Sequence, residues 1–335
     1  ASSQMLNNSV GYIQLTEFSY TAYNAFNSSI ARLKSKGMKK LILDLRNNGG
    51  GLLHIANQIL DEFLDSGKLI VYTEGTHTPR QETRATAFGN LERMDLVVLI
   101  NESSASASEI VAGAIQDNDR GNIIGRRSFG KGLVQQPINL KDGSELRLTI
   151  ARYYTPTGRS IQKSYQKGFD AYHSESYDRM KNGELYEIDS TLFVDSLKFS
   201  TPGGKVVYGG GGIMPDIFIP IDTSNYTPYL GELRFKDVFN HFAYDFANTH
   251  RKTWKNAQDF EQNFNMNAKV MSSFKNYAVK FHNVRHNEEQ YMRSIERIQL
   301  RIKADIARHL FDENAFYRIL SKDDNEIQAG IKSLQ

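Results

Sequence analysis

The chain has 335 residues, a formal net charge of +3, 24% charged residues and 40% hydrophobic residues. At about 100–200 residues per domain, this length indicates two domains and allows a sizeable core. The balanced charge argues against a nucleic-acid-binding protein, because such proteins usually concentrate basic residues on one face. Cysteine is absent, which excludes disulfide scaffolds, thiolate zinc sites and cysteine nucleophiles.

No membrane or targeting segment is visible in the sequence. The longest apolar runs, such as residues 96–100, have the length of strands and fall far short of the roughly 20 residues that span a bilayer. The N-terminus lacks a basic stretch followed by an apolar one, so we expect no signal peptide in this chain. Because the first residue is Ala1, we expect a mature or excised form.

Strand and helix patterns alternate through the first 160 residues. The run 40–45 is nearly all apolar, which is typical of a strand that is buried on both faces. Alternation with short links favours an α/β layered domain. We predict strands at 10–18, 40–45, 69–73, 96–100, 123–124, 133–140 and 146–154, and helices at 21–36, 52–64 and 104–115.

The later part of the chain changes character. Residues 164–204 lack a clear period, which indicates an insertion or surface excursion, and a strand bounded by prolines is predicted at 213–220. We therefore divide the chain into a core of residues 1–222 and a helical region of residues 223–335. That region is expected to pack against the core or to form a homo-oligomer interface. Its longest helix carries one apolar stripe that consists of Tyr291, Ile295, Ile298, Ile302, Ile306 and Leu310.

Several common catalytic and nucleotide-binding motifs are absent from the sequence or incomplete. Neither an HExxH helix nor a GxSxG turn is present. Residues 125–132 nearly match the phosphate-binding loop GxxxxGK[ST], but Gly132 stands where a hydroxyl would ligate magnesium. A strand rather than a helix follows this segment, so no helix N-terminus would face a phosphate. Nucleotide binding is therefore disfavoured.

The serine-rich segment 101–109 lies between a buried strand and a helix. A turn at this position can present a hydroxyl at the carboxyl edge of a sheet, and the free N–H groups of the following helix favour a developing oxyanion. Serine is also a common helix cap, and alternating serine and alanine pack closely. From this segment alone, capping and packing are the simpler explanation.

A serine nucleophile needs a base, and no histidine is indicated. A lysine can serve where burial removes water from its ammonium and lowers its pKa. Lys131 suits this role, because glycines on both sides allow close backbone approach and Phe129 supplies apolar cover. Gln135, four residues later, is a neutral amide that could orient the lysine.

Five short segments carry recognisable motifs in a fixed order. They are LILDLRNNGGGL at 41–52, SASASE at 104–109, SFGKGLVQ at 128–135, YTPTGRSIQ at 154–162 and GIMPD at 212–216. Each motif alone is weak, but the five in this order are specific. Together they resemble the signature of carboxyl-terminal processing peptidases, the tail-specific serine proteases, over residues 9–163 and 205–221.

This resemblance implies an α/β fold with a ClpP/crotonase-like layered core, an additional β-rich part and a helical C-terminal region. It also implies a Ser–Lys dyad that cleaves proteins near their C-termini without a metal or organic cofactor. By motif, Ser106 would be the nucleophile, Lys131 the general base and Gln135 the residue that positions the base. The implied oxyanion donors are the N–H of Ala107 and of a glycine in the turn before it, Gly50 by preference and Gly51 next.

The sequence departs from the family in its N-terminal part. Members usually carry a PDZ domain, which commonly binds the substrate tail as an added strand. Only about 40 residues precede the first motif, so we expect no PDZ domain in this chain. The expected partners are protein or peptide substrates bound through their C-terminal tails. The expected location, from the resemblance alone, is the periplasm or cell envelope of a bacterium.

Two other functions compete with a peptidase. The first is a non-catalytic scaffold or peptide-binding module that retains the fold, and the intact set of Ser106, Lys131 and Gln135 argues against it. The second is an acyl-CoA enzyme of the crotonase-type fold. A lysine paired with a glutamine has no evident use in that chemistry.

Overall fold

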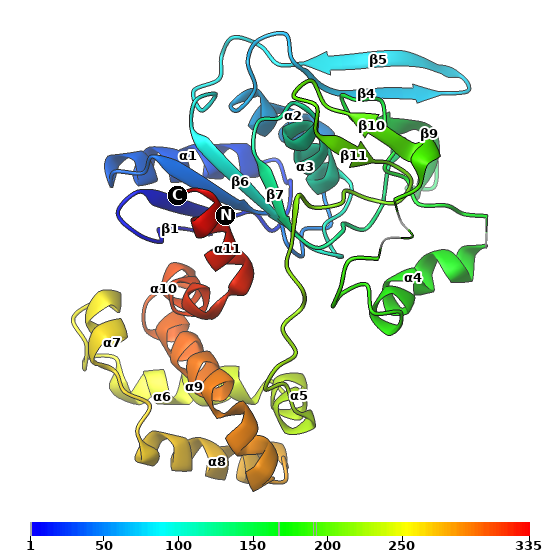
Figure 1. The fold of residues 1–335 in the computed structure, drawn as a ribbon. Helices are drawn as coiled ribbons and strands as arrows, with labels where there is room; N and C mark the ends of the chain where they lie inside the picture. The colour runs from blue at the N-terminus through cyan, green and yellow to red at the C-terminus, as the bar shows by residue number, and fades with distance from the viewer. Residues whose placement is uncertain (1, 167, 190, 192) are drawn as a thin grey trace. The chain divides into compact units, whose positions relative to one another are not determined.

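The computed structural model describes residues 2–335 except 167, 190 and 192 (Figure 1). The chain forms two compact units. The first contains residues 3–221 and 325–335, and the second contains Ser2 and residues 222–324. Each unit is built around a hydrophobic core of its own.

A six-stranded sheet in the order β1-β2-β3-β6-β7-β12 forms the centre of the first unit. From β2 to β12 each strand is parallel to its neighbour. The carboxyl ends of β3, β6 and β7 therefore meet at one edge of the sheet, from which the glycine turn and the serine segment leave. The strands are β1 (Ser2–Met5), β2 (Val10–Gln14), β3 (Lys40–Asp44), β6 (Asp95–Ile100), β7 (Asn122–Gly125) and β12 (Ile217–Phe218).

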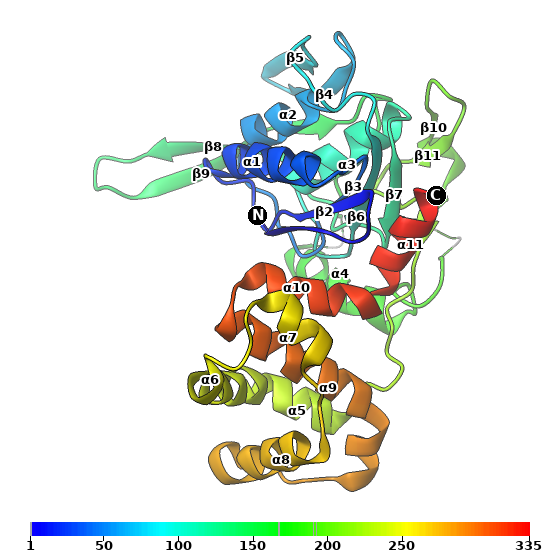
Figure 2. The ribbon, with the colours of Figure 1, turned by 90° about the vertical axis from the view of Figure 1, so that its left-hand side faces the viewer.

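Alternate residues of the central strands point to opposite faces of this sheet. One face, with Leu41 and Val98, packs under α1 (Ala22–Ser35), α2 (Leu53–Asp61) and α3 (Ala107–Asp117). These three helices lie on the same side of the sheet in Figure 2. The other face, with Ile42 and Val97, packs against Ile327 and Leu334 at the C-terminus. Burial on both faces explains why these strands are almost entirely apolar.

The last helix, α11 (Asn325–Ser333), belongs to the first unit. It packs against β3, β6 and β7. The prediction that residues 223–335 form one C-terminal region is therefore wrong for residues 325–335. The reason is that α11 supplies the apolar residues that cover the second face of the sheet.

A second sheet in the order β5-β4-β9-β8 is antiparallel throughout. Its strands β8 and β9 form a long hairpin that extends away from the rest of the first unit in Figure 2. This sheet corresponds to the additional β-rich part expected from the sequence. Its strands are β4 (Leu69–Gly75), β5 (Thr78–Arg84), β8 (Leu133–Asn139) and β9 (Glu145–Tyr154).

The excursion at 164–204 contains regular structure that the sequence analysis missed. It forms α4 (Phe169–Lys181), the 3-10 turn η2 (Asp195–Leu197) and β10 (Lys198–Ser200), which pairs with β11 (Val206–Tyr208). The face of α4 that is buried includes Tyr172 and Arg179. Because these residues are polar or amphipathic, they leave no apolar stripe in the sequence.

The second unit is a set of helices with an aromatic and aliphatic core. Ile298, Ile302 and Ile306 of α9 are fully buried in this core, which confirms that the stripe is a packing face. Side chains of Thr227, Asn256, Asn267, Asn287 and Asp312 cap five of the helices at their N-termini. The helical elements are α5 (Pro228–Phe235), α6 (Val238–His250), α7 (Ala257–Asn263), α8 (Ala268–His282), α9 (Glu288–Leu310), α10 (Glu313–Leu320) and the 3-10 turn η3 (Ser321–Asp323).

The predicted fold class is confirmed as a layered α/β core with an additional β-rich part and a helical region. Among the residues that the structure describes, no helix is both long enough and apolar enough to cross a membrane.

Candidate active site

Ser106 occupies a strained position between β6 and α3. It directly precedes the first residue of α3 and has a φ of +55° and a ψ of −114°. For a residue other than glycine, such a conformation costs about 1–3 kcal/mol and persists only where surrounding contacts impose it. The side chain is half-buried. A half-buried hydroxyl on a sharp turn at the carboxyl edge of a parallel sheet is well placed to act as a nucleophile.

The glycine turn after β3 lies directly against Ser106. Gly50 has a φ of +105°, and a Cβ on it would lie 2.8 Å from the Ser106 Cβ and 3.0 Å from the Ala107 nitrogen. A side chain at this position would therefore collide with the serine turn. Gly51 has a φ of +140°, and a Cβ there would lie 2.5 Å from the carbonyl oxygen of Phe18. Both positions require glycine.

The backbone N–H groups of the glycine turn and of Ala107 differ in their hydrogen bonds. The N–H of Gly50 donates to Oδ1 of Asn48 at 2.9 Å. By contrast, no acceptor for the N–H of Gly51 or of Ala107 occurs among the residues that the structure describes. The sequence analysis preferred Gly50 to Gly51 as an oxyanion donor, and which of the two donates stays a prediction.

Asn48 joins the glycine turn to the serine segment, and it is fully buried. Its carbonyl oxygen accepts hydrogen bonds from the Ala105 N–H at 3.0 Å and from the Ser108 hydroxyl at 2.9 Å. Its side-chain amide donates to the carbonyl of Leu15 at 2.7 Å. Ser108 thus holds the serine segment to the glycine turn.

Glu109 connects Ser106 to the loop that carries Lys131. One carboxylate oxygen, Oε2, accepts hydrogen bonds from the backbone N–H of Ser106 at 2.9 Å and of Lys131 at 2.8 Å. The other, Oε1, accepts from the Ser128 hydroxyl at 2.5 Å and from the Gly130 N–H at 2.6 Å. Burial raises the pKa of Glu109 above its ordinary value, and the four donors act in the opposite direction.

The Lys131 loop is held by backbone contacts on both sides of the lysine. The Phe129 N–H donates to the carbonyl of Ser104 at 2.9 Å. The Gly132 N–H donates to Oε1 of the buried Gln162 at 2.8 Å. The Lys131 side chain is half-buried. Across the described chain, its ammonium forms no ion pair with a carboxylate.

Gln135 lies further along the same segment, in β8, opposite Thr149 of β9. Its side chain is exposed, and within the described residues it makes no hydrogen bond to Lys131. The structure therefore joins the backbones of Ser106 and Lys131 through Glu109, and it places Gly50 against Ser106 and Ala107. It leaves Gln135 on the exposed hairpin.

Comparison with known proteins agrees with this arrangement. Residues 9–170 match the model of peptidase family S41, and residues 229–312 match a family of unknown function, DUF8443. We call residues 9–170 the S41 domain, after the family model that they match. This segment contains the glycine turn, the serine segment and the Lys131 loop described above.

Curated relatives share the S41 domain with this chain. The carboxyl-terminal-processing protease of Synechocystis sp. is 43% identical over 155 residues, which cover 46% of this chain and 36% of that protein. The carboxy-terminal-processing protease of Bartonella bacilliformis is 45% identical over 158 residues, with the same two coverages. The chain thus matches only about a third of the length of these relatives.

Among solved structures, the photosystem II D1 C-terminal processing protease is similar to this chain. The sequence identity is 38% and the TM-score is 0.43. The match covers 46% of this chain and 39% of that protein.

Helix α4 of the excursion packs on the Lys131 loop of the S41 domain. Arg179 donates to the carbonyl oxygens of Arg127 at 2.5 Å and of Ser128 at 3.0 Å. Burial lowers the pKa of Arg179, yet its guanidinium also pairs with Glu184 at 3.0 Å. These contacts give the excursion a structural role that its composition did not indicate.

An aromatic cluster adds to this contact. The Lys163 ammonium lies 3.9 Å from the centre of the Phe129 ring and 4.3 Å from that of Tyr172, and it pairs with Glu175 at 2.6 Å. Tyr172 stacks on Tyr165, and burial raises its pKa to about 12. The buried Lys163 side chain thus lies among two aromatic rings and a carboxylate.

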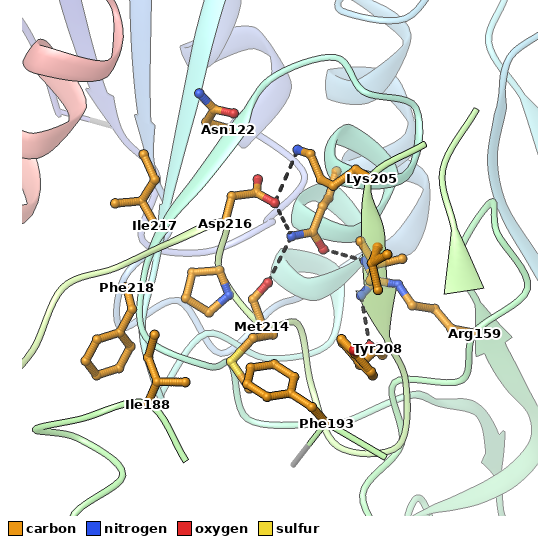
Figure 3. Close-up of a pocket in the computed structure, with 14 residues that line it drawn as sticks. Asn122, Arg159, Ile188, Phe193, Lys205, Tyr208, Met214, Asp216, Ile217 and Phe218 are labelled. Atoms are coloured by element: carbon orange, nitrogen blue, oxygen red, sulfur yellow. Dashed lines mark hydrogen bonds and ion pairs between the residues drawn. The ribbon is translucent and has the colours of Figure 1, made fainter. Parts of the chain in front are cut away.

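A pocket of about 450 Å³ lies at the other end of α3 from Ser106 (Figure 3). Its charged residues already pair with neighbours. Asp216 accepts from Gln116 at 2.9 Å and from the Ile123 N–H at 2.8 Å, and Lys205 lies 3.2 Å from it. Arg159 pairs with Asp117 at 2.7 Å. These bonds hold the YTPTGRSIQ and GIMPD segments to α3, and neither Ser106 nor Lys131 lines the pocket.

No group of histidine, aspartate and glutamate side chains suited to a metal ion occurs in the described part of the chain. Sequence reasoning missed Glu109, Gln162 and Arg179 as residues that hold the site. Glu109 and Gln162 lie within two of the quoted motifs, but only the tertiary contacts show which loops they join.

Proposed function

We propose that this chain is a serine endopeptidase that cleaves proteins at or near their C-termini, with Ser106 as nucleophile and Lys131 as general base. The observation that supports this most strongly is the shared contact on Glu109. A single carboxylate oxygen accepts hydrogen bonds from the backbones of Ser106 and Lys131, although the two residues are distant in sequence. A nucleophile and its base must lie close together, and a shared backbone contact with Glu109 supports such a placement.

The proposed reaction begins when the neutral Lys131 amine accepts the proton of the Ser106 hydroxyl. The serine oxygen attacks the scissile carbonyl carbon and forms a tetrahedral oxyanion. The C–N bond then breaks as the Lys131 ammonium returns its proton to the leaving amine. Water, deprotonated by Lys131, hydrolyses the resulting acyl-enzyme and restores the serine. No cofactor takes part in this sequence, and Gln135 is proposed to orient the amine of Lys131.

The oxyanion is proposed to accept hydrogen bonds from the N–H groups of Ala107 and of the glycine turn. Of the two glycines, Gly51 has the open N–H in this structure, whereas that of Gly50 is bonded to Asn48. Gly50 could donate only after its hydrogen bond to Asn48 breaks. Removing one such donor typically costs about 10²–10³-fold in kcat.

The proposed substrate is an extended peptide, the C-terminal tail of a protein. β8 begins two residues after Lys131 and is an edge strand of its sheet, so in the described structure its outer side pairs with no other strand. An extended peptide can add to such an edge through main-chain hydrogen bonds. Based on the family resemblance, we place the protein in the periplasm or cell envelope of a bacterium.

The test of this function is direct. The full chain is incubated with unstructured peptides that differ at the C-terminus, and products are mapped by mass spectrometry. Cleavage is expected near the C-terminus, and Ser106→Ala should lose at least about 10⁴-fold in kcat while remaining folded. Ser103→Ala, at an exposed serine of the same segment, is the control and should keep wild-type activity. Equal activity of Ser106→Ala and the wild type would rule out the proposal.

The glycine turn offers a matched pair of variants. In Gly50→Ala, the new Cβ would meet Ser106 and Ala107 at 2.8–3.0 Å in a backbone conformation unsuited to alanine. We expect at least about a 10²-fold loss of kcat. Gly49→Ala places its Cβ in open space, with no atom within 4 Å, and should stay active. Steady-state kinetics with circular dichroism measures both, and equal losses would contradict the steric argument.

A further inference from the structure

A cluster of five charged side chains lies beneath the carboxyl edge of the main sheet. Each of its two arginines pairs with a carboxylate besides that of Glu326. Arg46 binds Asp44 through Nε at 3.0 Å and through Nη2 at 2.6 Å. Arg126 binds Glu102 through Nε at 2.8 Å. The fifth residue, Glu326, comes from α11 and follows the entire helical unit in sequence.

Glu326 binds both arginines at once. Its Oε2 accepts from Nη1 of Arg46, and its Oε1 accepts from Nη1 of Arg126 at 2.5 Å. The Glu326 side chain is 10% exposed, and those of Arg46 and Arg126 are 13% and 8% exposed. Such nearly buried, charge-assisted contacts are shorter and stronger than hydrogen bonds between neutral groups.

The residues of the cluster lie at the start of three functional segments. Arg46 is four residues before Gly50, Glu102 is four residues before Ser106, and Arg126 is five residues before Lys131. A second tie already links the first two segments, because the side chains of Asn47 and Asn101 hydrogen-bond at 3.0 Å. The Arg126–Glu102 pair links the serine segment to the segment that leads into the Lys131 loop. The Glu326 carboxylate adds a direct link between the first and third segments, because it binds both Arg46 and Arg126.

We propose that Glu326 is a positioning residue for the reaction: by bridging Arg46 and Arg126, it fixes the glycine turn, the serine segment and the Lys131 loop relative to one another. It acts through these arginines rather than on the substrate. The proposal rests on the proposed peptidase function. It implies that the S41 core is completed only when the chain returns from the helical unit and adds α11.

Charge pairing explains why this role can be separated from stability. In Glu326→Gln, Arg46 keeps Asp44 and Arg126 keeps Glu102, so no buried arginine is left without a carboxylate. The variant is therefore expected to fold, whereas the ionic bridge between the two arginines is lost. A misplacement of about 1 Å among reacting groups can cost about 10²-fold in rate.

The test compares the full-length wild type, Glu326→Gln and the control Lys332→Gln, which changes an exposed residue of the same helix. We expect Glu326→Gln to lower kcat at least tenfold with KM within twofold. Backbone amides in 46–51, 102–107 and 126–131 should exchange with deuterium at least threefold faster than in the wild type. Lys332→Gln should match the wild type in both measurements. Unchanged kcat, or unchanged exchange in these segments, would overturn the proposal.

Two further outcomes are covered: Glu326→Gln does not fold, or the wild type cleaves no peptide. If Glu326→Gln does not fold, Glu326→Asp is used, which keeps the charge but is one methylene too short to hold both arginines. It should show the same drop in kcat and the same exchange pattern, and wild-type behaviour would overturn the proposal. If the wild type cleaves no peptide, the peptidase function fails, and the exchange measurement alone decides whether Glu326 holds the three segments.

Discussion

Replacing Lys131 by alanine is expected to abolish peptide cleavage, with a loss of at least about 10⁴-fold in kcat. The expectation follows from the proposed reaction, in which the lysine amine both removes the serine proton and protonates the leaving group. Because the side chain is half-buried and forms no ion pair in the described structure, its loss should leave the fold intact. Kinetics on the peptide panel, together with thermal unfolding, measures both effects.

Three variants separate the chemistry of Lys131 from its charge. Lys131→Arg keeps a positive charge but cannot supply a neutral base, since arginine stays protonated in proteins. It should be as inactive as Lys131→Ala. Lys141→Ala, at an exposed lysine of the hairpin tip, should be fully active. Gln135→Ala should lower kcat less than Lys131→Ala does, because Gln135 is proposed only to orient the amine.

Chemical rescue gives an independent result. A small primary amine added to Lys131→Ala can occupy the space of the missing side chain and accept the serine proton. Activity should then rise with the concentration of the unprotonated amine, whereas Ser106→Ala should not respond. A fully active Lys131→Ala variant would end the assignment of this residue as the base.

The parts of the fold that depend on local pattern could be predicted from the sequence. The buried strands that form β3 and β6, the helix before residue 36 and the stripe on α9 all follow from apolar spacing. The excursion could not be predicted, because the buried face of α4 uses Tyr172 and Arg179 in place of aliphatic residues. The predicted strand at 213–220 shortens to the two residues of β12, since most of that segment serves as a connection.

The placement of α11 was missed for a different reason. Nothing in its residues distinguishes a helix of the second unit from one that returns to the first. Only the sheet shows the difference, because Ile42 and Val97 lie on its second face and Ile327 packs against them. Long-range returns of this kind leave no periodic signal in a sequence.

The candidate site also contains residues that the sequence could predict and contacts that it could not. Ser106, Lys131 and the glycine turn could be named because their motifs stand in a fixed order along the chain. Which N–H is open could not be predicted, because the Gly50 amide depends on the position of the Asn48 side chain. The contributions of Glu109 and Glu326 are tertiary, since each carboxylate joins segments that are far apart in sequence.

Of the two substitutions Glu109→Gln and Glu326→Gln, Glu109→Gln is expected to lower kcat and stability more. Each carboxylate oxygen of Glu109 accepts two hydrogen bonds, so every one of its four neighbours is a donor. Glutamine replaces one of these oxygens with an NH₂ group. In one orientation the new donor faces the N–H groups of Ser106 and Lys131, and in the other it faces the N–H of Gly130. No rotation of the amide satisfies all four neighbours.

This mismatch is expected to lower both the free energy of unfolding and kcat. Each buried donor left without an acceptor costs about 1–3 kcal/mol, so the free energy of unfolding should fall by at least that amount. Because the contact that joins Ser106 to Lys131 is lost or weakened, kcat should fall by at least about 10²-fold. Denaturant unfolding and steady-state kinetics measure the two effects. Glu74→Gln, at an exposed carboxylate of β4, is the control and should change neither.

The decisive comparison is between activity and stability in the same variant. If Glu109 only supported the fold, an osmolyte that restores the stability of Glu109→Gln would also restore its kcat. If the carboxylate holds the nucleophile against its base, kcat should stay low in the stabilised variant, because the amide still cannot accept from both backbones. Full recovery of kcat under those conditions would show that Ser106 and Lys131 find their relative position without Glu109.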